Sequence, residues 1–170
     1  EGLGERRGTA LLHSFAEFSL GVRARALFTA DPSLPLPDVI IGRVTGGVRS
    51  DILGRIEVLQ RGMDGRGPGL FLINPAGIVF GGKSSVTVPG SFLATTATEL
   101  EFADGATLRV DPAPELPILS VPEVVRFGFD PGRATIAFRD DGPFDMNDKV
   151  FARSLTLAVS PQGSLSLSRS

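Results

Sequence analysis

The chain is divided into short apolar runs of three to five residues, each bounded by Gly, Pro, Asp, Asn or Ser. The runs lie at residues 39–41, 56–58, 70–73, 78–80, 86–88, 92–94, 108–110, 135–138, 155–159 and 165–167. Runs of this kind are typical of β-strands, and no window keeps a helical apolar spacing over three turns. The nearest helical candidate, residues 96–102, is too short to form a stable helix. The pattern therefore predicts an all-β fold.

The runs also repeat at a spacing of about 20 to 25 residues, which is the range of solenoid repeats. The pairs that define this spacing are Ile56 with Ile78 (22 positions), Val86 with Leu108 (22) and Phe71 with Phe92 (21). Such a repeat predicts a β-solenoid, in which each coil buries one face against the next. A β-sandwich is the alternative, because its turns recur about every 8 to 12 residues.

The segment LFLINPAGIVFGG, residues 70–82, places a rigid turn between two apolar runs. A type I turn favours Asn first, Pro second and Gly fourth, and Asn74, Pro75 and Gly77 meet these preferences. Pro75 fixes the φ angle, while the Asn74 side chain can accept hydrogen bonds from the backbone N–H groups that follow it. The segment is therefore predicted to be a corner that joins two buried strands at a set angle.

Composition excludes several classes of protein. The 170 residues fit a single domain, and the net charge of −2, with no long run of like charges, argues against nucleic-acid binding. No apolar stretch reaches the roughly 18 residues of a membrane span, so stable membrane insertion is not expected. Cys is absent, which excludes a disulfide framework and a thiolate zinc site.

Three stretches fit the repeat poorly and are predicted to be loops outside the solenoid body. They are DPSLPLPD at residues 31–38, DPAPELPILSVP at 111–122 and DDGPFDMND at 140–148. The last is acidic, but its spacing does not match a calcium-binding loop, and we expect it to be solvated.

No constellation of catalytic or ligating residues is visible in the sequence. His13 is the only histidine and lacks a partner at a recognisable spacing, so a structural or cap position is expected. Gly82-Lys83-Ser84 lacks the upstream glycine spacing of a phosphate-binding P-loop. Thr95 and Thr96 lack a base for a nucleophilic role, but an inward Thr there could join a polar ladder. We therefore expect no enzymatic activity, cofactor or metal.

Five blocks together resemble the secretion domain of two-partner-secreted exoproteins, the filamentous-haemagglutinin N-terminal or haemagglutination activity domain family. The blocks are LHSF at 12–15 with Phe18, IGRVTGG at 41–47, ILGRI at 52–56, LFLINPAGIVFG at 70–81 and GSFLATTA at 90–97. A weaker likeness continues through residues 119–132 and the LTL…LSL tail, so it covers nearly the whole chain. The family usually has Asn where Ala76 stands, and the segment before the first block is shorter here.

The resemblance implies a right-handed parallel β-helix with an N-terminal cap and extra-helical β-hairpins and loops. It implies that residues 1–170 are one secretion domain, the N-terminal part of a longer exoprotein. The implied partner is an outer-membrane β-barrel transporter whose periplasmic modules recognise the domain. The protein would then pass through the periplasm of a Gram-negative-type bacterium to the cell surface, where it starts β-helix folding of an adhesin-like passenger. A monomer is expected.

Within the family motifs, the candidates for transporter recognition are Asn74, Pro75, Gly77 and Ile78. Two roles stay open for Asn74, namely shaping the turn and contacting the transporter directly. Structural roles are expected for the motif residues His13, Phe15, Arg43, Thr45, Gly46, Gly54, Thr95 and Thr96.

Two other functions are open. A carbohydrate-binding surface adhesin module would need aromatic platforms, but Trp and Tyr are absent and the Phe residues lie in apolar runs. A β-helix enzyme that degrades polysaccharides would need carboxylates clustered on one outer face, whereas the acidic residues here are scattered over loops.

Overall fold

The computed structural model describes residues 4–59, 62, 65–110, 117–132, 134–140 and 149–169. In this part of the chain seventeen strands form four sheets. The strands are β1 (Glu5–Arg7), β2 (Ala10–Phe15), β3 (Arg25–Phe28), β4 (Val39–Val44), β5 (Ser50–Ile52), β6 (Arg55–Val58), β7 (Gly69–Ile73), β8 (Ile78–Phe80), β9 (Ser85–Thr87), β10 (Ser91–Thr95), β11 (Glu99–Phe102), β12 (Thr107–Arg109), β13 (Val124–Gly128), β14 (Thr135–Asp140), β15 (Val150–Phe151), β16 (Ser154–Ala158) and β17 (Ser164–Arg169).

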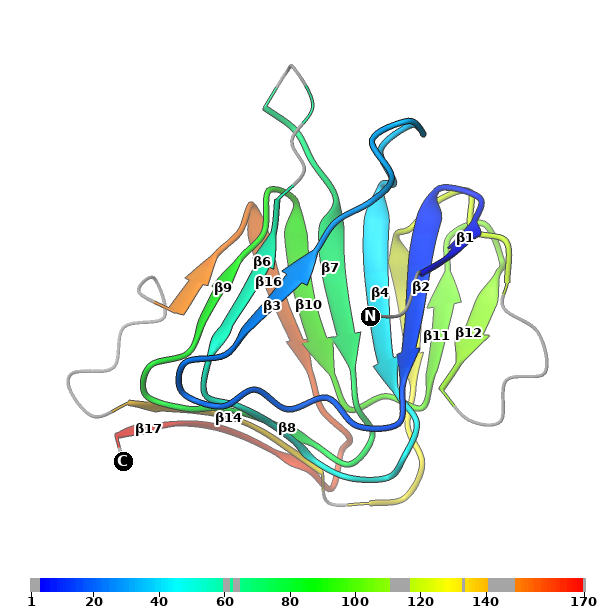
Figure 1. Cartoon of the computed structure of the whole chain (residues 1–170). Coiled ribbons are helices and arrows are strands. Elements are labelled where there is room, and N and C mark those ends of the chain that lie inside the picture. Colours follow the sequence, from blue (N-terminus) through cyan, green and yellow to red (C-terminus); the bar gives the residue numbers. More distant parts are fainter. Residues whose placement is uncertain are drawn as a thin grey trace.

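Three of the sheets form the walls of a β-helix (Figure 1). We call them the long sheet (β1-β2-β4-β7-β10-β16), the lower sheet (β17-β14-β8-β5) and the side sheet (β15-β9-β6-β3). Their strand pairs are parallel, except that β1 runs antiparallel to β2. The chain visits the long, lower and side sheets in turn, so β4, β5 and β6 make one coil and β7, β8 and β9 the next. The prediction of an all-β parallel β-helix is confirmed.

The coils are longer than the predicted repeat. Ala10 pairs with Val39, 29 positions later, and Val39 pairs with Gly69, 30 positions later. Among the paired strands of the described residues, only the step from β7 to β10, as from Leu70 to Phe92, takes 22 positions. The spacing of 20 to 25 residues was therefore wrong for most of the helix.

The predicted spacing failed because each coil contains three similar apolar runs, one for each wall. Ile56 lies on the side sheet and Ile78 on the lower sheet, so these two residues are not stacked. Leu108 lies on β12, outside the helix. Phe71 is paired with Leu93, so its alignment with Phe92 was one position out of register.

A fourth, antiparallel sheet of order β12-β11-β13 covers the outside of the long sheet. We call it the outer sheet; it is inserted between β10 and β14, so the coil that contains it takes 63 positions from Ser91 to its partner Ser154. Residues 99–102 of the weak helical candidate form its central strand. Of the predicted loops, 31–38 connects β3 to β4, while residues 111–116 and 141–148 lie outside the described residues.

Two apolar clusters result from the alternation of side chains along the long sheet. Leu70 and Leu72 point into the helix interior with Ile56, Ile78 and Phe80. The intervening residues of β7 instead pack between the long and outer sheets, in a cluster that contains Phe71, Ile73, Leu100 and Leu108. A strand covered on both faces is continuously apolar. The two-sided burial thus accounts for the unbroken apolar run of residues 70–73.

Strand β1 covers the edge of β2 and forms the N-terminal cap. Just after it, the backbone N–H of Thr9 donates to the carbonyl of Leu119 at 2.8 Å, and Gly8 forms an isolated bridge with the same residue. The cap is therefore tied to the segment that leads into the outer sheet.

Candidate functional site at the Asn74 corner

The segment Asn74-Pro75-Ala76-Gly77 forms the corner between β7 of the long sheet and β8 of the lower sheet. The N–H of Gly77 donates to the carbonyl of Asn74 at 3.0 Å and closes the turn. Gly77 has a φ of 112°, in the region that favours glycine. A side chain there would also meet the carbonyl of Thr135 on the following coil, with its Cβ only 2.9 Å from that oxygen.

The Asn74 side chain joins two successive coils at this corner. Its Nδ2 donates to the carbonyl of Val48 and to the Oγ of Ser50, each at 2.9 Å. Its Oδ1 accepts the N–H of Ala76 at 2.9 Å, which is the local turn contact expected for Asn. Both side-chain N–H donors and the carbonyl oxygen are therefore engaged.

Burial decides which part of the corner a partner can reach. Asn74 and Ile78 are both 0% exposed, and Gly77 is buried as well. Only the middle of the turn, Pro75 and Ala76, is half-buried. In the folded domain a partner can thus contact the turn's two central residues, but not the Asn74 amide.

Hydroxyl groups continue the polar line from Asn74 along the end of the long sheet. The N–H of Asn74 donates to the Thr95 carbonyl at 3.0 Å. The Oγ1 of Thr95 donates to the carbonyl of Ala158 at 2.8 Å and accepts the N–H of Ala97 at 3.0 Å. The Oγ1 of Thr96 accepts the N–H of Ser160 at 3.1 Å. These contacts tie the last long-sheet strand to the coils before it.

Thr45 lies directly after β4, at the corner one coil before the Asn74 turn. Its N–H donates to the carbonyl of Phe15 at 2.8 Å, and the neighbouring N–H of Gly46 donates to the carbonyl of Ala16 at 3.0 Å. A Cβ on Gly46 would lie 2.2 Å from that Ala16 oxygen. A Cβ on Gly54, at the next corner, would likewise lie 2.2 Å from the carbonyl oxygen of Ala24. Both glycines therefore permit close stacking of successive backbones.

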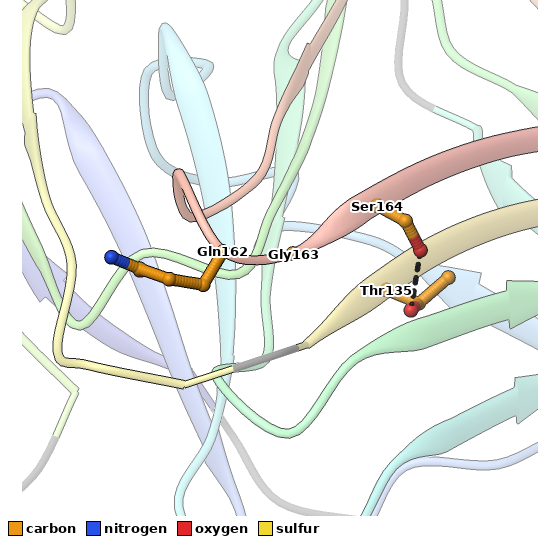
Figure 2. Close-up of a pocket in the computed structure, with 4 residues that line it drawn as sticks. All are labelled: Thr135, Gln162, Gly163 and Ser164. Carbon is orange, nitrogen blue, oxygen red and sulfur yellow. Dashed lines mark hydrogen bonds between the residues drawn. The ribbon is translucent and has the colours of Figure 1, made fainter.

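The corner is stacked further on Thr135 and Ser164, whose hydroxyl oxygens lie 2.9 Å apart (Figure 2). Together with Gln162 and Gly163 they line an open hollow of about 490 Å³. Gln162 extends away from the hydroxyl pair, as Figure 2 shows. The described residues that line this hollow are neutral and include no acid–base pair.

A smaller hollow of about 220 Å³ lies beside the accessible part of the turn. Its lining includes Pro75 and Ala76 from the corner, Val44 and Thr45 from the preceding coil, and Asp130 from the segment after β13. Its described lining mixes apolar and polar groups and includes the Asp130 carboxylate.

Arg43 connects the long sheet to the outer sheet. The residue is only 8% exposed, and its Nε donates to the Oγ of Ser14 at 2.7 Å. One terminal nitrogen donates to the carbonyl of Arg109 on β12 at 2.8 Å. A guanidinium can hold both acceptors at once because its donors form a rigid fork. Arg43 is therefore placed to fix the position of the outer sheet.

His13 lies in an aromatic cluster near the start of the helix. Its ring stacks on Phe15 with centroids 6.0 Å apart and meets Phe28 edge-on at 5.6 Å. Phe15 in turn contacts Phe18, at 5.1 Å. The His13 Nε2 is buried and has no hydrogen-bond partner among the described residues. Burial lowers the pKa of His13 from its usual 6.5, because it disfavours the charged ring.

Sequence reasoning missed Ser50 and Ser160, which complete the polar contacts of Asn74 and Thr96. Both serines are buried, Ser50 at the start of β5 and Ser160 after the end of β16, and a lone serine near a turn carries no signal of its long-range partner. Within the described ranges, no group of three or more His, Cys, Asp or Glu side chains could hold a metal ion. In the same part of the chain, no helix has the length and apolar character to cross a bilayer.

A sequence model of the family described as the TPS secretion domain matches residues 3–162. Neither the curated proteins nor the solved structures contain a match to this chain. The matched range includes the Asn74 corner, the outer sheet and nearly every strand of the helix.

Proposed function

Because this chain belongs to the TPS secretion domain family, we propose that its transporter reads the Asn74 segment in an extended form, before the corner closes. Domains of this family are non-catalytic and target exoproteins to their TpsB outer-membrane transporter. The protein is accordingly secreted across the Gram-negative outer membrane.

The complete burial of Asn74 and Ile78 carries this proposal. In the folded state the side-chain amide of Asn74 is hydrogen-bonded to Val48, Ser50 and Ala76. Its donors and its acceptor are therefore engaged within the domain and are not available to a partner. In an extended chain the same segment is a β-prone strand with free N–H and C=O groups. Such a strand can add to the edge of a partner's sheet.

Closure of the corner would then follow export. Once residues 48–50 and 74–77 meet, the Asn74 hydrogen bonds join two coils, and each finished coil is a template for the next. We further propose that the domain is monomeric and leads a longer exoprotein whose passenger is adhesin-like. The passenger's β-helix would start from the last coil of this domain.

Binding of the transporter's purified periplasmic modules tests the mode of recognition. We expect a peptide of residues 68–82 to bind these modules. A peptide of residues 98–110, from the outer sheet, should bind them much more weakly. The folded domain should not bind them through this corner. Binding of the folded domain that is lost on changing Ala76 to Glu would instead show that the closed turn is read. Absence of binding to the 68–82 peptide would reject recognition of the extended segment.

A further inference from the structure

The outer face of the side sheet carries a basic hollow, whereas the Asn74 corner lies between the long and lower sheets. The hollow has a volume of about 480 Å³. Its lining includes Arg55, Lys83 and Lys149, the hydroxyl residues Ser85 and Thr87, and Glu57. Three cations thus gather at one place in a chain with a net charge of −2.

Strand register builds the hollow. Arg25 of β3 pairs with Arg55 of β6, and Arg55 pairs with Ser85 of β9. Lys149 precedes β15 as Ser85 begins β9, so it continues the same row. Neighbouring strands lie about 4.8 Å apart. The small Ser85 side chain therefore leaves a gap between two long cationic side chains.

Two of the cations, Arg55 and Lys83, are not balanced by a carboxylate among the described residues. Glu57 is engaged by Arg25, with a terminal guanidinium nitrogen 2.5 Å from its Oε2. Arg55 stands in register with Arg25, and like charges opposite each other on neighbouring strands repel. Within the described residues, Arg55 and Lys83 form no ion pair with an acidic side chain. A bound anion would relieve this repulsion.

The other residues that line the hollow supply hydrogen-bond donors on the outer face of the side sheet. Lys149 is only 5% exposed and its Nζ donates to the carbonyl of Gly82, which fixes the ammonium at the rim. Ser85 and Thr87 are half-buried on the outer face and carry free-rotating hydroxyl donors. The backbone turn between them and Gly81 is closed by the N–H and Oγ of Ser84, both donated to the Gly81 carbonyl.

We propose that this hollow binds a phosphate group between Arg55 on one side and Lys83 on the other, with Ser85 and Thr87 donating to its oxygens. A phosphate monoester carries nearly two charges and several strong acceptor oxygens, which matches clustered cations and hydroxyl donors. The segment GGKSS, residues 81–85, leads into a strand rather than a helix, so the site is suited to a bare oxyanion and not to the phosphate chain of a nucleotide. The phosphate can be free in solution or belong to a lipid headgroup.

Thermal unfolding of the full chain in inorganic phosphate tests the site, with potassium chloride at equal ionic strength as the reference. We expect the wild-type Tm to rise by roughly 5 to 10 °C at one hundred times the Kd. The double substitution R55Q/K83Q should abolish the rise, and so should Ser85→Asp alone. The matched control R23Q/R126Q removes two exposed arginines elsewhere and should keep it. The proposed site would be rejected if phosphate did not raise the Tm of the wild type, or if it raised the Tm of R55Q/K83Q by the same amount.

Sedimentation with phosphatidylcholine vesicles, with and without phosphatidic acid, separates the two sources of phosphate. If the wild type and R23Q/R126Q bind the phosphatidic acid vesicles and R55Q/K83Q does not, the phosphate bound in the hollow belongs to a lipid headgroup. A Tm rise in phosphate without vesicle binding would assign it to a soluble phosphate. Vesicle binding that both double variants keep would be unspecific and would count against a lipid role for this hollow.

Discussion

The Nδ2 of Asn74 lies 2.9 Å from the Oγ of Ser50, one coil earlier, and both residues are fully buried. The register places Ser50 opposite Ile78, directly after the Asn74 turn. One side chain therefore sets both the shape of its own turn and the stacking of that turn on the preceding coil. This double role explains why a corner without reactive groups lies between two continuously apolar strands.

Replacement of Asn74 by Ala should destabilise the purified domain by about 2 to 4 kcal/mol, because it leaves the buried Ser50 hydroxyl and the partly buried Val48 carbonyl and Ala76 N–H without their hydrogen bonds. Urea unfolding measures the change. Pro75→Ala, in the same turn but outside these contacts, should cost less than about 1 kcal/mol. Equal costs for the two variants would mean that the amide network adds little to the corner.

The sequence predicted the corner but not its partners. Asn, Pro and Gly specify a turn through local backbone preferences, which act within four residues and are therefore visible in the sequence. The contact with Ser50 depends on which coil stacks on which, and the 28 positions from Ser50 to Ile78 do not follow a fixed repeat. Loop lengths between the walls vary, so similar apolar runs on different walls imitate a shorter period.

The outer sheet shows a second limit of the sequence pattern. Leu100 and Leu108 alternate with polar residues as strands should, but the same pattern fits a coil of the helix. Their antiparallel pairing within the excursion is set by the turn at residues 103–106, where Asp104 accepts the N–H of Ala106 at 3.0 Å. Asp104 also accepts the N–H groups of Ser120 and Val121, which hold the segment before the sheet's third strand in place, and these long-range contacts leave no signal in the sequence.

Thr95→Val should lower stability by about 1 to 3 kcal/mol, although the two side chains have nearly the same shape. Val removes the hydroxyl that donates to the Ala158 carbonyl and accepts the N–H of Ala97. Hydrogen exchange should become faster at the amide of Ala97. The exposed Thr107 provides the control, since Thr107→Val should change stability by less than about 0.5 kcal/mol. Unchanged exchange at Ala97 would contradict the role assigned to the Thr95 hydroxyl.

Arg43→Lys should loosen the outer sheet, because an ammonium cannot reproduce the fork that holds the Ser14 hydroxyl and the Arg109 carbonyl. We expect a loss of about 2 to 3 kcal/mol and faster hydrogen exchange on β12 than on β4. Arg126→Lys, at an exposed position of the same sheet, is the control. Faster exchange spread evenly over the chain would indicate a general effect and not a link between sheets.

His13 should make stability depend on pH. Its folded-state pKa is lowered by burial, so between that value and 6.5 the unfolded state binds a proton that the folded state does not. The contribution of His13 to the free energy of unfolding is therefore fully present above pH 6.5. It is lost as the pH falls from 6.5 through the folded-state pKa. His13→Phe, which keeps a ring against Phe15 and Phe28, should remove this slope in urea midpoints measured from pH 5 to 8. If the urea midpoint of His13→Phe still depends on pH between 5 and 8, the dependence arises from carboxylates and not from His13.

A disulfide between β10 and β16 should block export. Ser91 and Ser154 are paired in register with their Oγ atoms 2.8 Å apart, so S91C/S154C places two thiols within reach of each other. The bond would close a loop of 63 positions that spans the outer sheet, and a chain locked in this form cannot pass a pore in extended form. Because the protein has no other Cys, no competing disulfide can form.

Secretion of S91C/S154C is therefore expected to fall when the periplasm is made oxidising and to recover when a reductant is added. Each single cysteine variant should be secreted normally in both conditions, which separates the cross-link from the substitutions. Non-reducing gels locate the cross-linked form in the periplasmic or the extracellular fraction. Extracellular protein that was already cross-linked in the periplasm would show that this coil passes the transporter folded. Recognition of an extended Asn74 segment would then have to occur without unfolding of the coil between β10 and β16.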